Sequence, residues 1–263
     1  MKKIVIKIGT AVLTDKDGNL DEGAIQGLVK QICRMLDSEI LVLVVSSGAS
    51  GAGMGLLNIK KRPQDLAELQ SLASIGQTHL MNAYNKYFSK DGRLTGQILL
   101  TQDDFDNRVR YLNIKYTINT LLGRGVIPII NENDTIQTEE IKCGDNDRLS
   151  GLVADLTEAD TLIMLTNVDG LLDREGKLIK EIDNITDNIR ALAEKTKAGL
   201  GTGGMYTKIQ AAEFSTKSGI ECYIANGKSK DVLINILNKK GRFTHFKAKA
   251  SKVTAKKRWI GFG

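Results

Sequence analysis

The feature that most constrains the fold is a set of short, continuous apolar runs separated by segments with helical periodicity. Residues 40–45 read Ile-Leu-Val-Leu-Val-Val and carry no polar side chain. A strand that is apolar at every position is typical of a parallel sheet covered by helices on both faces. Residues 21–36 and 64–88, by contrast, place apolar side chains at helical spacing. This alternation predicts an α/β fold, specifically a three-layer α/β/α sandwich around a mainly parallel central sheet.

The same reading predicts the remaining elements. Further strands are expected at 3–8, 94–100, 126–130, 161–165 and 221–225, with further helices near 109–122, 149–156, 187–196, 205–218 and 229–238. Pro128 lies inside one of these strands and has no N–H to donate, so we expect a bulge or an edge position there. Residues 171–182, which contain Asp-Arg-Glu-Gly at 173–176, are expected to form a hairpin.

The positive charge of the chain is concentrated near its C-terminal end. The formal net charge is +6, yet no Asp or Glu follows Asp231, and residues 232–263 carry nine Lys and Arg. Residues 1–231 hold 28 basic and 31 acidic side chains, a net charge of −3. We expect one domain over residues 1–240 and a basic tail over residues 241–263. Nucleic-acid binding through this tail is one alternative, but the tail has few aromatic side chains and no recognised binding motif, so a solvated or subunit-contacting segment is favoured.

Cysteine and histidine usage excludes several classes of chemistry. Cys33, Cys143 and Cys222 are far apart and form no Cys-x-x-Cys pair, which argues against a disulfide framework or a thiolate zinc site and favours a cytoplasmic location. No apolar run approaches the roughly 20 residues that a membrane span needs. The chain has only two histidines, His79 and His245, and we assign neither a role. Enzymatic chemistry in this chain is therefore expected to use lysines, carboxylates and backbone amides.

Glycine-rich segments follow two of the predicted strands. Lys7 and Gly9 close the first strand; a lysine there can meet a phosphate, although this segment alone is more typical of an edge lysine and a turn glycine. Residues 46–55 contain four glycines after a buried strand. We interpret them as an anion-binding nest of consecutive exposed backbone amides; the alternative is a flexible loop.

A third glycine-rich segment, residues 199–208, precedes a predicted helix. Its glycines match the G-x-G-x-x-G pattern, but the segment does not follow the first strand, so a dinucleotide-binding fold is not predicted. Thr207 stands where a Walker A loop has glycine. The start of the helix should still attract phosphate, with Lys208 one turn inside it. Residues 166–167 and 169–170, after the strand at 161–165, would complete a nucleotide pocket; the alternative for them is a plain hairpin turn.

Two polar clusters are candidates for the site of a polar, amino-bearing ligand. Residues 131–134, Asn-Glu-Asn-Asp, follow the strand at 126–130, and residues 142–147, Lys-Cys-Gly-Asp-Asn-Asp, come before a helix. Taken singly, these side chains are also typical of turns and helix caps. Two dense clusters ten residues apart favour a binding site.

Together these segments resemble the amino acid kinase family over essentially the whole chain, from residues 7–10 to residues 257–260. The most specific pieces are residues 130–134, 144–147 and 199–205, in this order and at these separations. Within the family, the resemblance is to enzymes that transfer the γ-phosphoryl group of ATP to the side-chain carboxylate of L-glutamate, the first step of proline biosynthesis. Many such enzymes carry a C-terminal PUA domain, and we expect this chain to lack one. The Asn after Thr166 is Asp in some relatives.

The resemblance implies a role for individual residues. Lys7 and Lys208 match lysines that hold the phosphates, and Asp147 matches the aspartate that arranges both lysines. Glutamate-binding positions are matched by Ser47, Asp134 and Asn146. Nucleotide-binding positions, besides the two lysines, are matched by Thr166, Asn167, Thr202, Gly203, Gly204, Met205, Tyr206 and Thr207. No direct metal ligand is implied.

The resemblance also implies ligands and partners. They are ATP with Mg²⁺ bound mainly through the nucleotide phosphates, L-glutamate, proline as a feedback inhibitor, and a second copy of the chain in a homodimer or homotetramer; no membrane is expected. Other activities of the same family stay open, namely phosphorylation of acetylglutamate, aspartate, uridylate or carbamate.

Overall fold

The computed structural model describes residues 1–15, 18–136, 145–194 and 204–249. Within them the strands are β1 (Lys3–Ile8), β2 (Leu41–Ser46), β3 (Thr95–Leu100), β4 (Ile127–Glu132), β5 (Thr161–Thr166), β6 (Glu181–Ile182), β7 (Glu221–Asn226) and β8 (Phe243–Phe246). These eight strands of the described residues form a single sheet in the order β3-β4-β2-β1-β5-β7-β8-β6. The pairs from β3 to β7 are all parallel, as expected.

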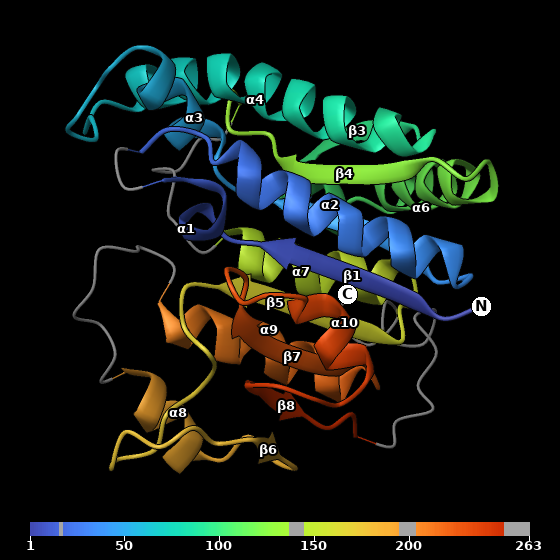
Figure 1. The fold of residues 1–263 in the computed structure, drawn as a ribbon, viewed down its shortest axis with the longest axis vertical. Coiled ribbons are helices and arrows are strands. Elements are labelled where there is room, and N and C mark those ends of the chain that lie inside the picture. Colours follow the sequence, from blue (N-terminus) through green and yellow to red (C-terminus); the bar gives the residue numbers. More distant parts are fainter. Residues whose placement is uncertain (16–17, 137–144, 195–203, 250–263) are drawn as a thin grey trace.

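Helices cover both faces of this sheet, which gives the predicted three layers (Figure 1). They are α1 (Thr10–Leu13), α2 (Glu22–Asp37), α3 (Ala49–Leu56), α4 (Leu66–Phe88), the 3₁₀ turn η1 (Ser89–Asp91), α5 (Asp103–Asp106), α6 (Arg108–Gly123), α7 (Asp145–Leu156), α8 (Asp187–Glu194), α9 (Met205–Lys217) and α10 (Val232–Leu237). In the described part of the chain, no helix is both long and apolar enough to cross a membrane.

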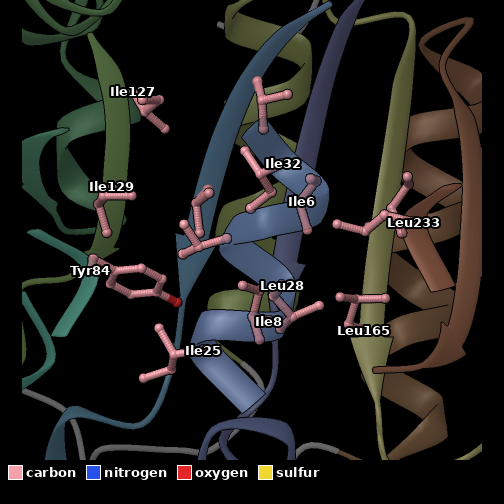
Figure 2. Close-up of a cluster of buried hydrophobic side chains, with 14 of the residues drawn as sticks. Ile6, Ile8, Ile25, Leu28, Ile32, Tyr84, Ile127, Ile129, Leu165 and Leu233 are labelled. Carbon is pink, nitrogen blue, oxygen red and sulfur yellow. The ribbon is translucent and has the colours of Figure 1, made fainter. Parts of the chain in front are cut away.

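Strand β1, in the centre of the sheet, divides its side chains between the two layers. Ile4, Ile6 and Ile8 pack with α1, α2, α10 and the second half of α4, whereas Val5 packs with α7 and α9. Figure 2 shows Ile6 and Ile8 against side chains of α2. Since side chains alternate along a strand, Lys7 lies on the same face as Val5, where α7 and α9 pack.

The sheet extends further than the sequence analysis predicted. Residues 243–246, which were assigned to the tail, form β8 antiparallel to β7, and β8 also pairs with the short strand β6. The strand was missed because it has four residues and lies among lysines. The predicted hairpin at 171–182 is present as an antiparallel bridge between Leu172 and Leu178.

The expectation of a bulge or edge position at Pro128 is wrong, because β4 lies between β3 and β2 inside the sheet. The backbone N–H of Ile127 donates to Leu94 of the β3 side. The nitrogen of Pro128, one residue later, therefore faces β2. Pairing with β2 begins only at Ile129, so the missing N–H costs no ladder hydrogen bond.

Most of the glycine-rich segment after β2 is helical, because residues 49–56 form α3, so the flexible-loop alternative is wrong. Its glycines allow α3 to touch α4 backbone to backbone. A Cβ atom on Gly76 of α4 would lie 1.8 Å from the carbonyl oxygen of Ala49, and one on Gly53 would lie 2.0 Å from the oxygen of Leu72. Gly53 and Gly76 therefore permit close helix packing. Anion binding by the backbone amides at the start of this segment stays a prediction.

This contact predicts that Gly76→Ala lowers the free energy of unfolding by about 3 kcal/mol, because the helices must move apart to admit a methyl group. Chemical denaturation would measure the change. Gly27→Ala is the matched control: Gly27 lies within α2, and a Cβ there would meet no atom within 4 Å. That variant should gain about 0.5–1 kcal/mol. Equal stability of the two variants would contradict the close contact.

Candidate active site

The candidate site lies where the carboxyl ends of β1, β2, β4 and β5 meet the starts of α7 and α9. In open α/β sheets this edge is where ligands bind. The parallel register places Ile8 beside both Ser46 and Leu165, so the residues that follow all three strands lie together. The sequence predicted most of these residues individually, and the sheet explains why they meet.

The centre of the site is a buried ion cluster, the lysine–aspartate triad, formed by Lys7 of β1, Asp147 of α7 and Lys208 of α9. One carboxylate oxygen of Asp147 lies 2.7 Å from Nζ of Lys7, and the other lies 3.1 Å from Nζ of Lys208. Asp147 is fully buried and each lysine is 5% exposed. Residues 61, 140 and 201 positions apart in the sequence therefore form one charged group.

The electrostatics of the triad favour an ionised carboxylate with an excess of positive charge. Burial alone would raise the pKa of Asp147, but Lys7 and Lys208 outweigh this effect and hold the pKa below its ordinary value of 3.8. Two ammonium groups and one carboxylate give the triad a net charge of +1. Such a buried cluster suits a polyanion such as the triphosphate of a nucleotide.

The start of α9 adds a second anion-binding feature beside the triad. Gly204 is the N-cap residue of α9. Glycine has no side chain that could accept a hydrogen bond from the backbone N–H groups of the first turn. The hydroxyl of Thr207 donates to Asp147 over 2.7 Å, which ties this turn to the triad. Met205 is buried and Tyr206 half-buried in the same turn. Of the nucleotide-binding residues implied above, Thr202 and Gly203 lie outside the described residues.

Thr166 is the last residue of β5 and Asn167 follows it, next to the loop that comes after Lys7. The N–H of Gly9 donates to Leu165 over 3.0 Å, which places this loop against the end of β5. Thr166 is buried and Asn167 exposed, and the hydroxyl of Thr166 lies 3.4 Å from the Oδ1 of Asn167. Their position at the strand end matches the prediction.

A chain of hydrogen bonds between amide side chains extends from the triad toward α4. The Nδ2 of Asn146 donates to Ser47 over 3.1 Å and to the Oδ1 of Asn131 over 2.9 Å. The Nδ2 of Asn131 donates in turn to Gln77 over 2.8 Å. Ser47 and Asn146 thus meet as expected. The Oδ1 of Asn146 is buried without a hydrogen-bond partner among the described residues.

Beyond this chain is a cavity of about 200 Å³ between α4, β3 and the end of β4. Asp134 lines it, together with Glu132 and Gln77. Asn131 belongs to the predicted polar cluster at 131–134, whereas Gln77 was not predicted as a site residue. A polar residue inside the otherwise apolar, buried stripe of α4 is the signal that could have indicated Gln77.

Comparisons with known proteins identify a family model, relatives and solved structures that are similar to this chain. The model of the amino acid kinase family matches residues 2–226. A glutamate 5-kinase of Thermoanaerobacter sp. (strain X514) is 46% identical over 99% of this chain and 72% of its own length. A glutamate 5-kinase of Clostridium acetobutylicum is 43% identical over 94% of both chains.

Two solved structures share the fold at low sequence identity. UMP kinase from Ureaplasma parvum has a TM-score of 0.62 at 18% identity, covering 94% of this chain and all of that one. Carbamate kinase from Giardia lamblia, bound to AMP-PNP, has a TM-score of 0.64 at 16% identity, covering 94% and 98%. At these identities the likeness concerns the fold alone.

Proposed function

Because the chain belongs to the amino acid kinase family, we propose that it transfers the γ-phosphoryl group of ATP to the side-chain carboxylate of L-glutamate, as the name of its glutamate 5-kinase relatives implies. The products are γ-glutamyl phosphate and ADP, and the reaction is the first step of proline biosynthesis. One observation supports this most directly. Asp147, which pairs with both lysines, directly follows Asn146, which begins the amide chain toward the acidic cavity. The phosphate end and the acceptor end of the site therefore meet at two consecutive residues.

The acceptor needs little chemical activation. A glutamate side chain has a pKa near 4.3, so it is already an ionised nucleophile at neutral pH. No general base is required, which agrees with the scarcity of histidine in the chain. The enzyme must instead align two anions and neutralise the charge between them.

Lys7 and Lys208 supply that neutralisation. Their ammonium groups are held on opposite oxygens of one buried carboxylate, so their positions are set before the substrates bind. Preorganised charges of this kind stabilise a transition state because no solvent has to reorganise. Asp147 acts as a positioning residue and keeps the two cations together.

The residues beside the triad fit a nucleotide. The N–H groups at the start of α9 can donate to phosphate oxygens, and Thr166 and Asn167 border the same edge of the sheet. Mg²⁺, when bound, supplies further charge neutralisation on the phosphates. We propose that the nucleotide phosphates carry this ion, as the resemblance to the family implies.

The acceptor end fits an α-amino acid. Asp134 lines the cavity, and the carbonyl oxygen of Asn146 has no hydrogen-bond partner among the described residues; both attract the ammonium group of glutamate. Ser47 and Asn146 are joined by a hydrogen bond at the boundary with the triad, where the side-chain carboxylate would lie.

We expect Asp134→Ala and Asn146→Ala to raise KM for L-glutamate about 10-fold or more while changing KM for ATP less than about 3-fold, because each removes a polar contact to the amino acid alone. Steady-state titration of each substrate would measure both constants. Asp21→Ala is a control: it removes the cap of α2, where Asp21 accepts from the N–H of Ala24, and should lower stability without changing either KM. Equal effects on both substrates would argue against an acceptor site here.

The function itself is tested by ADP release with different acceptors. We expect L-glutamate to support turnover, and N-acetylglutamate, aspartate, UMP and carbamate to support little. A larger rate with any of these four would assign the chain to another activity of the family.

We further infer a homodimer or homotetramer, inhibition by proline and a cytoplasmic location. The first two rest on the resemblance to the family. The location is supported by Cys33 and Cys222, which are buried free thiols. Repeating the glutamate assay with added proline would test the inhibition.

A further inference from the structure

The direction of the amide chain is determined by a backbone group. The N–H of Glu132 donates to the Oδ1 of Asn131 over 2.9 Å. A backbone N–H can only donate, so the atom that it contacts must be the carbonyl oxygen of Asn131. That oxygen also accepts from Asn146 and is therefore saturated. The Nδ2 of Asn131 is left as the donor to Gln77.

The orientation of Gln77 follows from this bond. Its Oε1 accepts from Asn131 over 2.8 Å, so its Nε2 points the other way. Gln77 is 91% buried, and its Nε2 has no hydrogen-bond partner among the described residues. Leaving a buried donor unpaired costs about 1–3 kcal/mol. The unpaired Nε2 of Gln77 is therefore unfavourable in free energy, and a ligand that accepts a hydrogen bond from it would remove that cost.

The cavity described above offers the complementary chemistry for such a ligand. Gln77 lines it from α4, and Asp134 and Glu132 line it from the end of β4. A fixed N–H donor beside carboxylates suits a group that presents one anionic oxygen and one ammonium, as the α-carbon of an amino acid does.

We propose that the Nε2 of Gln77 binds the α-carboxylate of the acceptor amino acid, with Asn131 as the residue that orients it. This inference rests on the proposed function. The amide chain begins at Asn146, beside the triad, and ends at Gln77 on α4. The side-chain carboxylate, which accepts the phosphoryl group, lies at the Asn146 end next to the lysines. The α-carboxylate of the same amino acid lies at the Gln77 end.

The variant Gln77→Glu tests the donor directly. It keeps an oxygen for Asn131 and replaces only the Nε2 by a second, negatively charged oxygen. We expect KM for L-glutamate to rise on the order of 30-fold, because a charge-assisted hydrogen bond becomes a repulsion, while KM for ATP changes less than about 2-fold.

Two controls separate substrate binding from a structural role. Gln31→Glu makes the same exchange at a glutamine that is 92% buried on α2, where both polar atoms have partners, Leu233 and Gly27. It should leave both KM values unchanged. The second control is 4-aminobutyrate, which is glutamate without the α-carboxylate. Its inhibition constant against L-glutamate should not rise in Gln77→Glu.

The outcomes distinguish the two levels of inference. If the wild-type protein releases no ADP with L-glutamate, the proposed function fails and this inference falls with it. If the wild type is active and Gln77→Glu binds L-glutamate as tightly, Gln77 is not a substrate contact. If Gln77→Glu weakens the binding of 4-aminobutyrate as much as that of L-glutamate, Gln77 does not bind the α-carboxylate.

Discussion

Asp147→Asn is expected to lower the free energy of unfolding by about 3–5 kcal/mol, because it leaves two buried ammonium groups without their anion. Lys7 and Lys208 are each 5% exposed and cannot turn to water without disturbing β1 or α9. Turnover should fall as well, since the two cations repel each other once the carboxylate is gone. Denaturant unfolding and steady-state kinetics of the same preparation would measure both effects.

The pH dependence of stability provides a second test of Asp147. Its pKa is lowered in the folded protein, so the carboxylate stabilises the fold above the unfolded-state pKa near 4 and loses this contribution as pH falls through the folded-state pKa. The free energy of unfolding of Asp147→Asn should therefore fall less steeply below about pH 4 than that of the wild type. Thr207→Val, which removes one neutral donor to Asp147, should cost only about 1 kcal/mol. An Asp147→Asn protein as stable as the wild type would contradict a buried, charged triad.

Lys208→Ala is expected to lower kcat by a factor on the order of 10²–10³, because a preorganised charge at the transferring group contributes a few kcal/mol to the barrier. KM for both substrates should change much less. Single-turnover measurement of ADP formation would separate the chemical step from product release.

Lys217→Ala is the matched control for this prediction. Lys217 lies on the same helix but is exposed, and it pairs with Glu213 over 2.7 Å at the surface. Exposed pairs of this kind contribute about 0–1 kcal/mol to stability, and this one is far from the triad along α9. Its removal should leave kcat unchanged. If kcat of Lys208→Ala equals that of the wild type, Lys208 is not part of the catalytic machinery.

The residues of the triad illustrate what could be predicted from the sequence. Lys7 stands at the end of an apolar run, Asp147 near the start of a helix, and Lys208 one turn inside another helix. Each position follows from local periodicity, and parallel strands bring their carboxyl ends to one edge. The resemblance to the family then assigned their roles. The distances of 2.7 and 3.1 Å and the lowered pKa of Asp147 needed the packed structure.

The errors of the sequence analysis share a physical origin. The glycines of residues 46–55 indicated a nest or a loop locally, but at Gly53 the contact between α3 and α4 is what requires a glycine. Pro128 suggested an edge strand, yet the sheet tolerates it because pairing with β2 starts one residue later. In the sequence, Phe243–Phe246 resembled part of a basic tail. In the structure these residues form a strand because they pair with β7. In each case the deciding neighbour is distant in sequence.

The sequence by itself determined the class of fold, the family and most of the candidate site residues, because hydrophobic periodicity and short polar motifs are properties of neighbouring residues. Only the tertiary structure decided which polar groups are left unpaired. Gln77 is the example. The backbone N–H of Glu132 fixes the orientation of the Asn131 amide, and Asn131 in turn fixes that of the Gln77 amide. Gln77 lies on α4, whereas the other two residues lie on β4. Hydrogen-bond direction is set by contacts across the fold, and local sequence patterns do not encode it.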